Sequence, residues 1–213
     1  VLRSDAKAEG SKVVIGGWRL PPSGSTRDAA WYSYTWGESE IPRAYSKGAP
    51  NKTIAASELL ATLTAALLLL PDCRDSREPH ARLTMSLTAS TDNKGNAFVL
   101  DKYLITKFPL SVVLLELAHH LQRLGVLMQL QWIPREANGE ADDLTNDRFE
   151  AFNSAMRVTT PWPELPFWFL RTELGGGAPP GEHEEEEESI DPIGQQVLPA
   201  AGFSAPLRVR APW

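Results

Sequence analysis

The spacing of apolar and polar residues along the chain alternates between a period typical of strands and one typical of helices. Residues 83–89 show the first period most clearly, because their apolar side chains alternate strictly with threonine and serine. This period, or a richness in β-forming side chains, predicts five strands: residues 1–7, 12–20, 31–36, 83–89 and 126–133. Gly10 and Ser11 make a turn between the first two segments, so we expect the chain to begin with a hairpin.

Leucines at helical spacing mark the two clearest helices. Four helices are expected in all: residues 53–70, 93–104, 111–124 and 139–157. Pro71 and Gly125 end the first and third of these, and Asn138 is a good N-cap for the last. The order β-β-β-α-β-α-α-β-α predicts an α/β fold with a mixed five-stranded sheet. Three antiparallel meander strands come first, parallel αβ units follow, and helices flank the sheet.

The composition changes after residue 160. Residues 1–160 hold 18 basic and 18 acidic side chains, whereas residues 161–213 hold 3 basic and 9 acidic ones, which accounts for the net charge of −6. We expect a domain over 1–160, an aromatic and proline-rich segment over 161–173 that packs on it or on a neighbour, and a disordered acidic tail over 174–213. A neutral domain lacks the basic face usual for nucleic-acid binding, unless several carboxylates bind metal.

Composition also disfavours several classes of protein. Cys73 is the single cysteine, so no internal disulfide forms, and no run of 18 apolar residues or signal peptide is present. We expect an intracellular protein of the cytoplasm or nucleus, neither secreted nor membrane-bound, and the start at Val1 suggests a piece of a longer polypeptide or a processed product. The oligomeric state stays open. His119 and His120 point about 100° apart on one helix, which favours a surface role over a shared metal.

Four carboxylates fall at distinctive places in this order of elements. Asp5 ends the first strand, Glu58 lies inside the first long helix, Asp92 directly follows the fourth strand, and Asp142 begins the last helix. Strands one and four are neighbours in such a sheet, so the four side chains can converge. Converging carboxylates repel one another unless cations neutralise them, and oxygen ligands suit Mg²⁺ or Mn²⁺. Two such ions can clamp the attacking and leaving oxygens of a phosphodiester cleavage.

Each carboxylate also has an ordinary structural explanation. Asp5 is typical of a turn or cap, Asp92 can cap the following helix, and Asp142 and Asp143 both suit a helix N-terminus. Glu58 is more informative, because its helical neighbours are apolar or small and an unpaired carboxylate on that face is costly. The structural alternative is that Glu58 lies at the edge of the apolar face of this helix and reaches water.

The motifs around these carboxylates resemble those of ribonuclease H domains, in the same order. They are Ser4-Asp5-Ala6, Ser57-Glu58-Leu59-Leu60-Ala61, Ser90-Thr91-Asp92-Asn93 and Asn138-Gly139-Glu140-Ala141-Asp142-Asp143-Leu144. The stretch Trp132-Ile133-Pro134-Arg135-Glu136-Ala137-Asn138 is similar to the ribonuclease H domain behind the reverse transcriptase of tyrosine-recombinase (DIRS-like) retrotransposons. The resemblance covers about residues 1–150. It implies the following site: metal ligands Asp5, Glu58, Asp92 and Asp142, with Asp143 as the fallback for Asp142, and substrate contacts Asn93, Arg135 and Asn138.

The resemblance implies an endonuclease that uses two Mg²⁺ or Mn²⁺ ions to hydrolyse the RNA strand of an RNA–DNA hybrid. Its products are a 5′-phosphate and a 3′-hydroxyl, recognition depends on backbone shape and 2′-hydroxyls, and a polymerase domain precedes it in one reverse-transcriptase polypeptide. Two alternatives stay open. The family's histidine before the last helix has no counterpart between Pro134 and Asn138, which fits a degenerate module that binds nucleic acid or protein. A 3′–5′ exonuclease of the same superfold also uses four acidic residues, but its usual Tyr or His is absent from residues 135–141.

Overall fold

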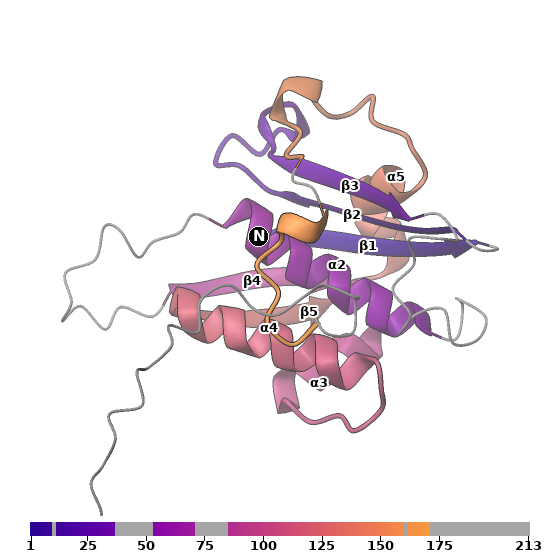
Figure 1. The fold of residues 1–213 in the computed structure, drawn as a ribbon. Helices are drawn as coiled ribbons and strands as arrows, with labels where there is room; N and C mark the ends of the chain where they lie inside the picture. The colour runs from indigo at the N-terminus through magenta and orange to yellow at the C-terminus, as the bar shows by residue number, and fades with distance from the viewer. Residues whose placement is uncertain (10–11, 37–52, 71–84, 160–161, 171–213) are drawn as a thin grey trace, which may run out of the picture. The chain divides into compact units, whose positions relative to one another are not determined.

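Five strands and four α-helices make up most of the residues that the computed structural model describes (Figure 1). It describes residues 1–9, 12–36, 53–70, 85–159 and 162–170, all within the compact unit Val1–Pro179. The elements are β1 (Leu2–Glu9), β2 (Lys12–Arg19), β3 (Trp31–Trp36), α2 (Ile54–Leu69), β4 (Met85–Thr91), α3 (Lys94–Lys102), α4 (Leu110–Leu124), β5 (Val126–Trp132) and α5 (Gly139–Thr145). The expected tail over 174–213 and the expected strand start at residues 83–84 lie outside the described residues.

The strands form one sheet in the order β3-β2-β1-β4-β5. β1 pairs antiparallel with β2, and β2 pairs antiparallel with β3, whereas β4 is parallel to both β1 and β5. The predicted fold class, a meander followed by parallel αβ units, is therefore confirmed. β4 and β5 pair along their whole length, but β1 and β4 pair only at Leu2↔Ala89 and Arg3↔Ser90. The sheet consequently opens between β1 and β4 just after Arg3 and Ser90.

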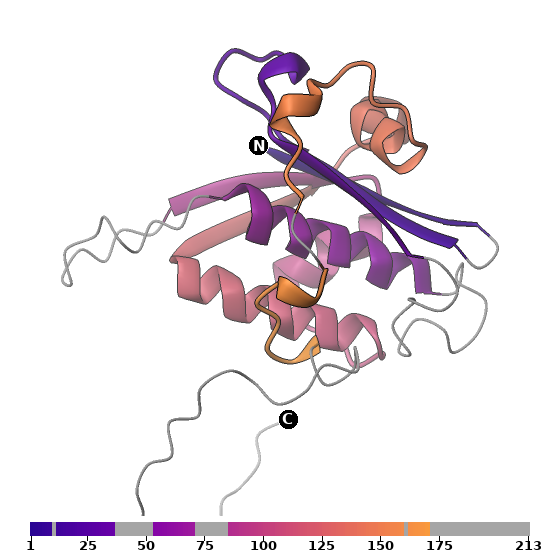
Figure 2. The same cartoon turned by 45° about the horizontal axis from the view of Figure 1, so that its top comes forward.

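Helices cover both faces of the sheet. α2 and α4 lie on one face and α5 on the other (Figure 2). Consecutive residues of β1 point to opposite faces, so the strand contacts both layers. The hydroxyl of Ser4 lies 3.0 Å from that of Thr62 in α2, while the carboxylate of Asp5 accepts a hydrogen bond from Thr145 in α5. β1 thereby links the two helical layers at the place where the sheet opens.

The apolar core divides between the two faces of the sheet. The larger cluster lies between the sheet, α2 and α4, and buries nearly every side of α2. The smaller cluster packs α5 on the opposite face around Trp18, Trp31 and Phe152. Gly16 of β2 permits this docking, because a Cβ there would lie 2.7 Å from the Cβ of Leu144. A larger residue at position 16 would push α5 away from the strands.

The last helix is shorter than its sequence predicts. The pattern favours a helix over 139–157, but α5 ends at Thr145. The backbone N–H of Asn146 donates to two carbonyls of the last turn, and Asp147 then adopts a left-handed conformation with φ 58°. The chain turns there so that Phe149 and Phe152 can reach the ring of Trp31. Aromatic packing across the sheet therefore overrides the helical propensity of this segment.

A buried hydrogen bond on α4 contradicts the surface role expected for His120. The side chain of His120 is 4% exposed, and its Nε2 lies 2.8 Å from Oε1 of Glu116 one turn earlier. The fully buried carboxylate of Glu116 also accepts backbone N–H groups from Trp168, Phe169 and Leu170 at 2.6–2.9 Å. Although burial opposes its charge, the hydrogen bonds from His120 and from the backbone N–H groups of Trp168 and Leu170 hold the pKa of Glu116 below its usual range. Part of the aromatic segment is thus tied to α4.

Apolar side chains of the same segment complete the core. Leu165, Phe167 and Leu170 are buried in the larger cluster, and the ring of Trp162 packs edge-on against that of Trp36.

The boundaries expected for the domain, the aromatic segment and the acidic tail stay a prediction. Among the described residues, no helix is long and apolar enough to cross a membrane.

Candidate metal centre

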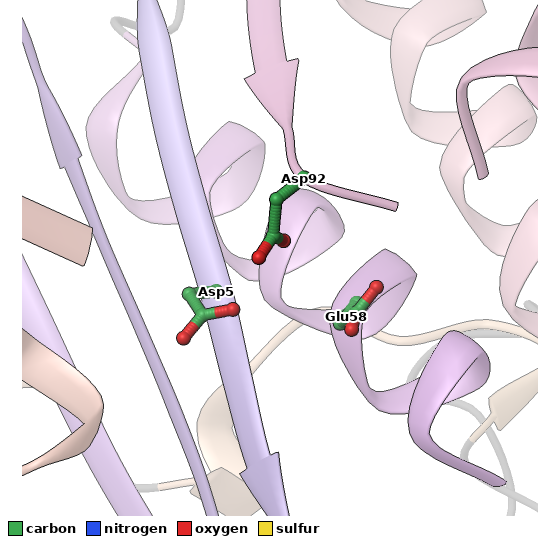
Figure 3. Close-up of side chains that lie close together, drawn as sticks. All are labelled: Asp5, Glu58 and Asp92. Carbon is green, nitrogen blue, oxygen red and sulfur yellow. The ribbon is translucent and has the colours of Figure 1, made fainter. Parts of the chain in front are cut away.

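Three carboxylates meet where the sheet opens. Asp5 lies two residues beyond Arg3 in β1, and Asp92 lies two residues beyond Ser90 of β4, so the last β1–β4 pair places them opposite each other. Glu58 reaches the same place from the first turns of α2 (Figure 3). One oxygen of each carboxylate lies within 4.8 Å of one oxygen of the other two. We call Asp5, Glu58 and Asp92 the carboxylate cluster.

Neighbouring polar side chains orient two members of the cluster. Thr145 Oγ1 lies 3.0 Å from Oδ2 of the buried Asp5 and donates to it. The side chain of Asn93 is hydrogen-bonded to Glu58, and Asn96 Nδ2 lies 3.4 Å from the same carboxylate. Asn93 also caps α3, since its Oδ1 accepts the N–H of Asn96. The first turn of α3 is therefore built around the carboxylate of Glu58.

Asp92 is held through its backbone rather than its side chain. Its carbonyl oxygen accepts a hydrogen bond of 3.0 Å from Trp132 Nε1, and the ammonium of Lys94 lies 4.2 Å from the centroid of that indole ring. Its Oδ1 is buried and has no hydrogen-bond partner among the described residues. A buried oxygen without a donor is costly, whereas it suits a position that a cation occupies.

The electrostatics of the carboxylate cluster favour a bound cation. Burial and, after it, the charge of Asp92 together raise the pKa of Asp5 to about 6, against the lowering effect of the hydrogen bond from Thr145. Burial likewise raises the pKa of Glu58 to about 7. The protein therefore opposes the charged state of these groups when no cation is present. Carboxylate oxygens alone form a hard donor set, so the residues fit a divalent cation such as Mg²⁺ or Mn²⁺.

Asp142 borders the cluster but does not join it. Its Oδ1 accepts a hydrogen bond of 3.0 Å from Arg135, and its Oδ2 accepts hydrogen bonds of 3.1 Å from Arg148 and 3.0 Å from Asn146. Its charge still raises the pKa of Asp5, so the groups lie within electrostatic reach. The structure thus brings together three of the four ligands implied by the family pattern, and it pairs the fourth with two guanidinium groups.

The other residues expected at the site take different positions. Asp143 accepts a hydrogen bond of 2.7 Å from Arg148 Nε. Asn138 is buried and does not cap α5 with its side chain; its amide donates instead to the carbonyl of Ser4 at 3.2 Å. It thereby holds the short 3-10 helix η3 (Arg135–Asn138) against β1. The Arg135 side chain is 75% exposed on the rim of the site.

Sequence reasoning missed several residues that shape the centre, among them Thr145, Trp132 and Arg148. Thr145 orients Asp5 although it is 140 positions away in the chain, and no linear spacing indicates that contact. Trp132 and Arg148 reach Asp92 and Asp142 from a strand end and a loop. Of these three, only Trp132 carries a weak signal, because it is the first residue of the stretch Trp132–Asn138.

The fold and the cluster define a mixed-sheet domain with a candidate divalent-metal centre. The chain is similar to LC11-RNase H1, which was isolated from compost and solved in complex with an RNA/DNA hybrid. The two share 20% identity over 68% of this chain and 93% of that one, with a TM-score of 0.47. It is also similar to RNase H1 from the halophilic archaeon Halobacterium salinarum NRC-1, at 17% identity over 70% of this chain and 96% of that one, with a TM-score of 0.42.

A third similar structure is the N-terminal RNase H domain of a Mycobacterium tuberculosis protein. It is 16% identical over 70% of this chain and 92% of that one, with a TM-score of 0.37. No protein-family model matches the chain, and no curated protein matches it. Function is therefore inferred from the carboxylates and their surroundings.

Proposed function

We propose that this protein is a metal-dependent endonuclease that hydrolyses the RNA strand of RNA–DNA hybrids. The observation that carries the proposal is the convergence of Asp5, Glu58 and Asp92 at the opening between β1 and β4. The buried, unpartnered Oδ1 of Asp92 and the raised pKa values of the other two carboxylates support a cation there. The order of the motifs around them resembles that of ribonuclease H domains, and this resemblance supports an RNA–DNA hybrid as the substrate.

The residues proposed to hold metal are Asp5, Glu58, Asp92 and Asp142, with Asp143 as the fallback for Asp142. Their oxygens suit two Mg²⁺ or Mn²⁺ ions. Such ions supply the positive charge that stabilises the attacking and leaving oxygens during phosphodiester hydrolysis. In that reaction a water oxygen bonds to phosphorus, the bond from phosphorus to the 3′-oxygen breaks, and a 5′-phosphate and a 3′-hydroxyl remain.

The chain's own groups orient the ligands and meet the substrate. Thr145 and Asn93 fix the carboxylates of Asp5 and Glu58 by hydrogen bonds. Arg135, exposed on the rim, is proposed to contact a phosphate, and Asn93 a neighbouring part of the strand. Asn138 acts from behind by holding η3 against β1. Recognition through backbone shape and 2′-hydroxyls would explain how a nearly neutral domain selects a hybrid.

The wider context is a reverse transcriptase of a retroelement. The stretch Trp132–Asn138 and the motif that follows it support this part of the proposal, through their similarity to the DIRS-like domains. A polymerase domain would then precede residues 1–160 in the same polypeptide and present the hybrid to the centre.

The test is cleavage of an end-labelled RNA–DNA hybrid by the full chain in Mg²⁺ or Mn²⁺. We expect internal RNA fragments, an intact DNA strand, and no cleavage in EDTA. Asp92→Asn should abolish cleavage, whereas Asp101→Asn, at an exposed ion pair in α3, should not.

Other outcomes of the same experiment point to the alternatives. Tight binding of the hybrid without cleavage, with the polymerase region attached, would replace the proposal with a degenerate binding module. Stepwise shortening from a 3′ end, of DNA as well as RNA, would replace it with an exonuclease. Equal activity of Asp92→Asn and wild type would remove the carboxylate cluster from the reaction.

A further inference from the structure

Two arginines occupy the carboxylate of Asp142. Arg135 Nη2 lies 3.0 Å from Oδ1, and Arg148 Nη2 lies 3.1 Å from Oδ2, which also accepts a hydrogen bond from Asn146. Both oxygens are therefore engaged. A carboxylate in this state binds a cation less readily than an oxygen without a donor, such as Oδ1 of Asp92, and one partner must leave before Asp142 can act as a ligand.

These pairs stand at the edge of the carboxylate cluster. The positive charge of Arg135 lowers the pKa of Glu58, and Asp5 and Asp92 help to raise the pKa of Arg135. Asp142 in turn raises the pKa of Asp5. A cation that enters the cluster therefore attracts Asp142 and repels the guanidinium that holds it.

The two arginines differ in the partners that they keep once Asp142 has left them. Arg148 keeps a second partner, because its Nε donates to Asp143 at 2.7 Å. Arg135 has no other charged partner within 4.0 Å among the residues that the structure describes, and its side chain is 75% exposed. Its planar guanidinium is suited to take a phosphate oxygen in place of the carboxylate.

We propose that Asp142 is exchanged between the arginines and the metal. Without a divalent cation, Arg135 and Arg148 hold its carboxylate at the rim; when the cation binds, Asp142 turns to it, Arg148 stays on Asp143, and Arg135 is released toward the substrate. The inference rests on the proposed function, since it requires the carboxylate cluster to bind metal. It explains why the structure brings three ligands together and leaves the fourth in an ion-pair network.

The arginines consequently compete with the cation. An exposed ion pair shifts an equilibrium by a factor of roughly two to five, so breaking one pair should improve metal affinity by a similar factor. Isothermal titration calorimetry with Mn²⁺ on the full chain, without nucleic acid, measures this affinity independently of catalysis. We expect Arg135→Ala to bind Mn²⁺ about two- to fivefold more tightly than wild type, and Arg135→Gln to do the same.

Two further variants separate release of Asp142 from a general change of charge. Lys12→Ala removes a positive charge from an exposed pair with Asp147, just after α5, that touches no carboxylate of the centre. We expect it to leave the affinity unchanged. In the Asp142→Asn background, Arg135→Ala should bring no gain in Mn²⁺ affinity, because the carboxylate for which Arg135 and the cation compete is then absent.

The outcomes distinguish this inference from the proposed function. Mn²⁺ binding that Asp92→Asn abolishes, but that Arg135→Ala and Arg135→Gln leave unchanged or weaken, would overturn the exchange and keep the metal centre. The exchange is also wrong if Lys12→Ala raises the affinity as much, or if the gain survives Asp142→Asn. Mn²⁺ binding that is absent from wild type, or equally tight in Asp92→Asn, would overturn the metal centre and the exchange together.

Discussion

Replacing Glu58 with glutamine should stabilise the metal-free protein at neutral pH. Burial, helped by the charges of Asp92 and Asp5, raises the pKa of Glu58 from its ordinary 4.5 to about 7. Between these two pH values the folded state keeps a proton that the unfolded chain has released. Stability falls wherever the folded state binds more protons, so the free energy of unfolding decreases as the pH rises through this window. It is unaffected by Glu58 below the window, where both states are protonated.

The magnitude follows from the size of the shift. One pKa unit corresponds to about 1.4 kcal/mol, so a rise from 4.5 to about 7 costs the folded state roughly 3 kcal/mol at pH 8. At pH 5 the same relation gives a cost of about 1 kcal/mol. Glutamine carries no charge at either pH, and its amide oxygen can still accept the hydrogen bond from Asn96. We therefore expect the free energy of unfolding of Glu58→Gln to exceed that of wild type by roughly 3 kcal/mol at pH 8 and by about 1 kcal/mol at pH 5.

Urea denaturation in EDTA at both pH values measures these free energies of unfolding. Glu136→Gln is the matched control, because Glu136 is exposed in η3, and it should behave as wild type at both pH values. Addition of Mn²⁺ at pH 8 should stabilise wild type more than Glu58→Gln, since the variant lacks one proposed ligand. An advantage of Glu58→Gln that is the same at pH 5 and pH 8, or its absence at pH 8, would refute the assignment of a strained, buried carboxylate.

Three further predictions test the surroundings of the centre. Gly16→Ala sets a Cβ 2.7 Å from a side chain of α5 and should lower the free energy of unfolding by about 1–3 kcal/mol in urea; no change would contradict the tight docking. Glu116→Ala leaves the N–H groups of residues 168–170 without an acceptor, so limited proteolysis should cut there faster, and unaltered resistance would show that other contacts hold the segment. Thr145→Val removes the hydrogen bond that lowers the pKa of Asp5, so an NMR titration without metal should find that pKa above about 6; an unshifted value would exclude the contact.

The sequence predicts the sheet and all three residues of the carboxylate cluster, for physical reasons. Three strands close together in the chain favour a meander, and strands separated by helices favour parallel pairing. A residue that directly follows a parallel strand lies at the edge where ligands gather, so its position favours Asp92 as a site residue. Glu58 was recognisable because a carboxylate among small apolar neighbours requires compensation. Asp5 can be predicted as the third member, because the first and fourth strands are neighbours in such a sheet.

The remaining features depend on contacts that no linear pattern records. The end of α5 is set by aromatic packing on Trp31 across the sheet, and the partners of Asp142 come from a 3-10 helix and a loop on either side of it. The pair of Glu116 and His120 was accessible in principle, because residues four apart on a helix are neighbours. The burial of this pair could not be predicted from the helix alone, because it depends on a segment about 50 residues further along the chain.

Glu116 recognises the polypeptide backbone and no side chain of residues 168–170. Its anchor is therefore indifferent to the identity of those residues, apart from proline, which lacks the N–H that each position donates. The rings of Trp168 and Phe169 lie 5.9 Å and 5.8 Å from the ring of His119 in α4, so a change at either position removes a ring contact but keeps the hydrogen bond to Glu116. A single buried carboxylate thus fixes the path of the chain at this point through hydrogen bonds that any residue except proline can donate.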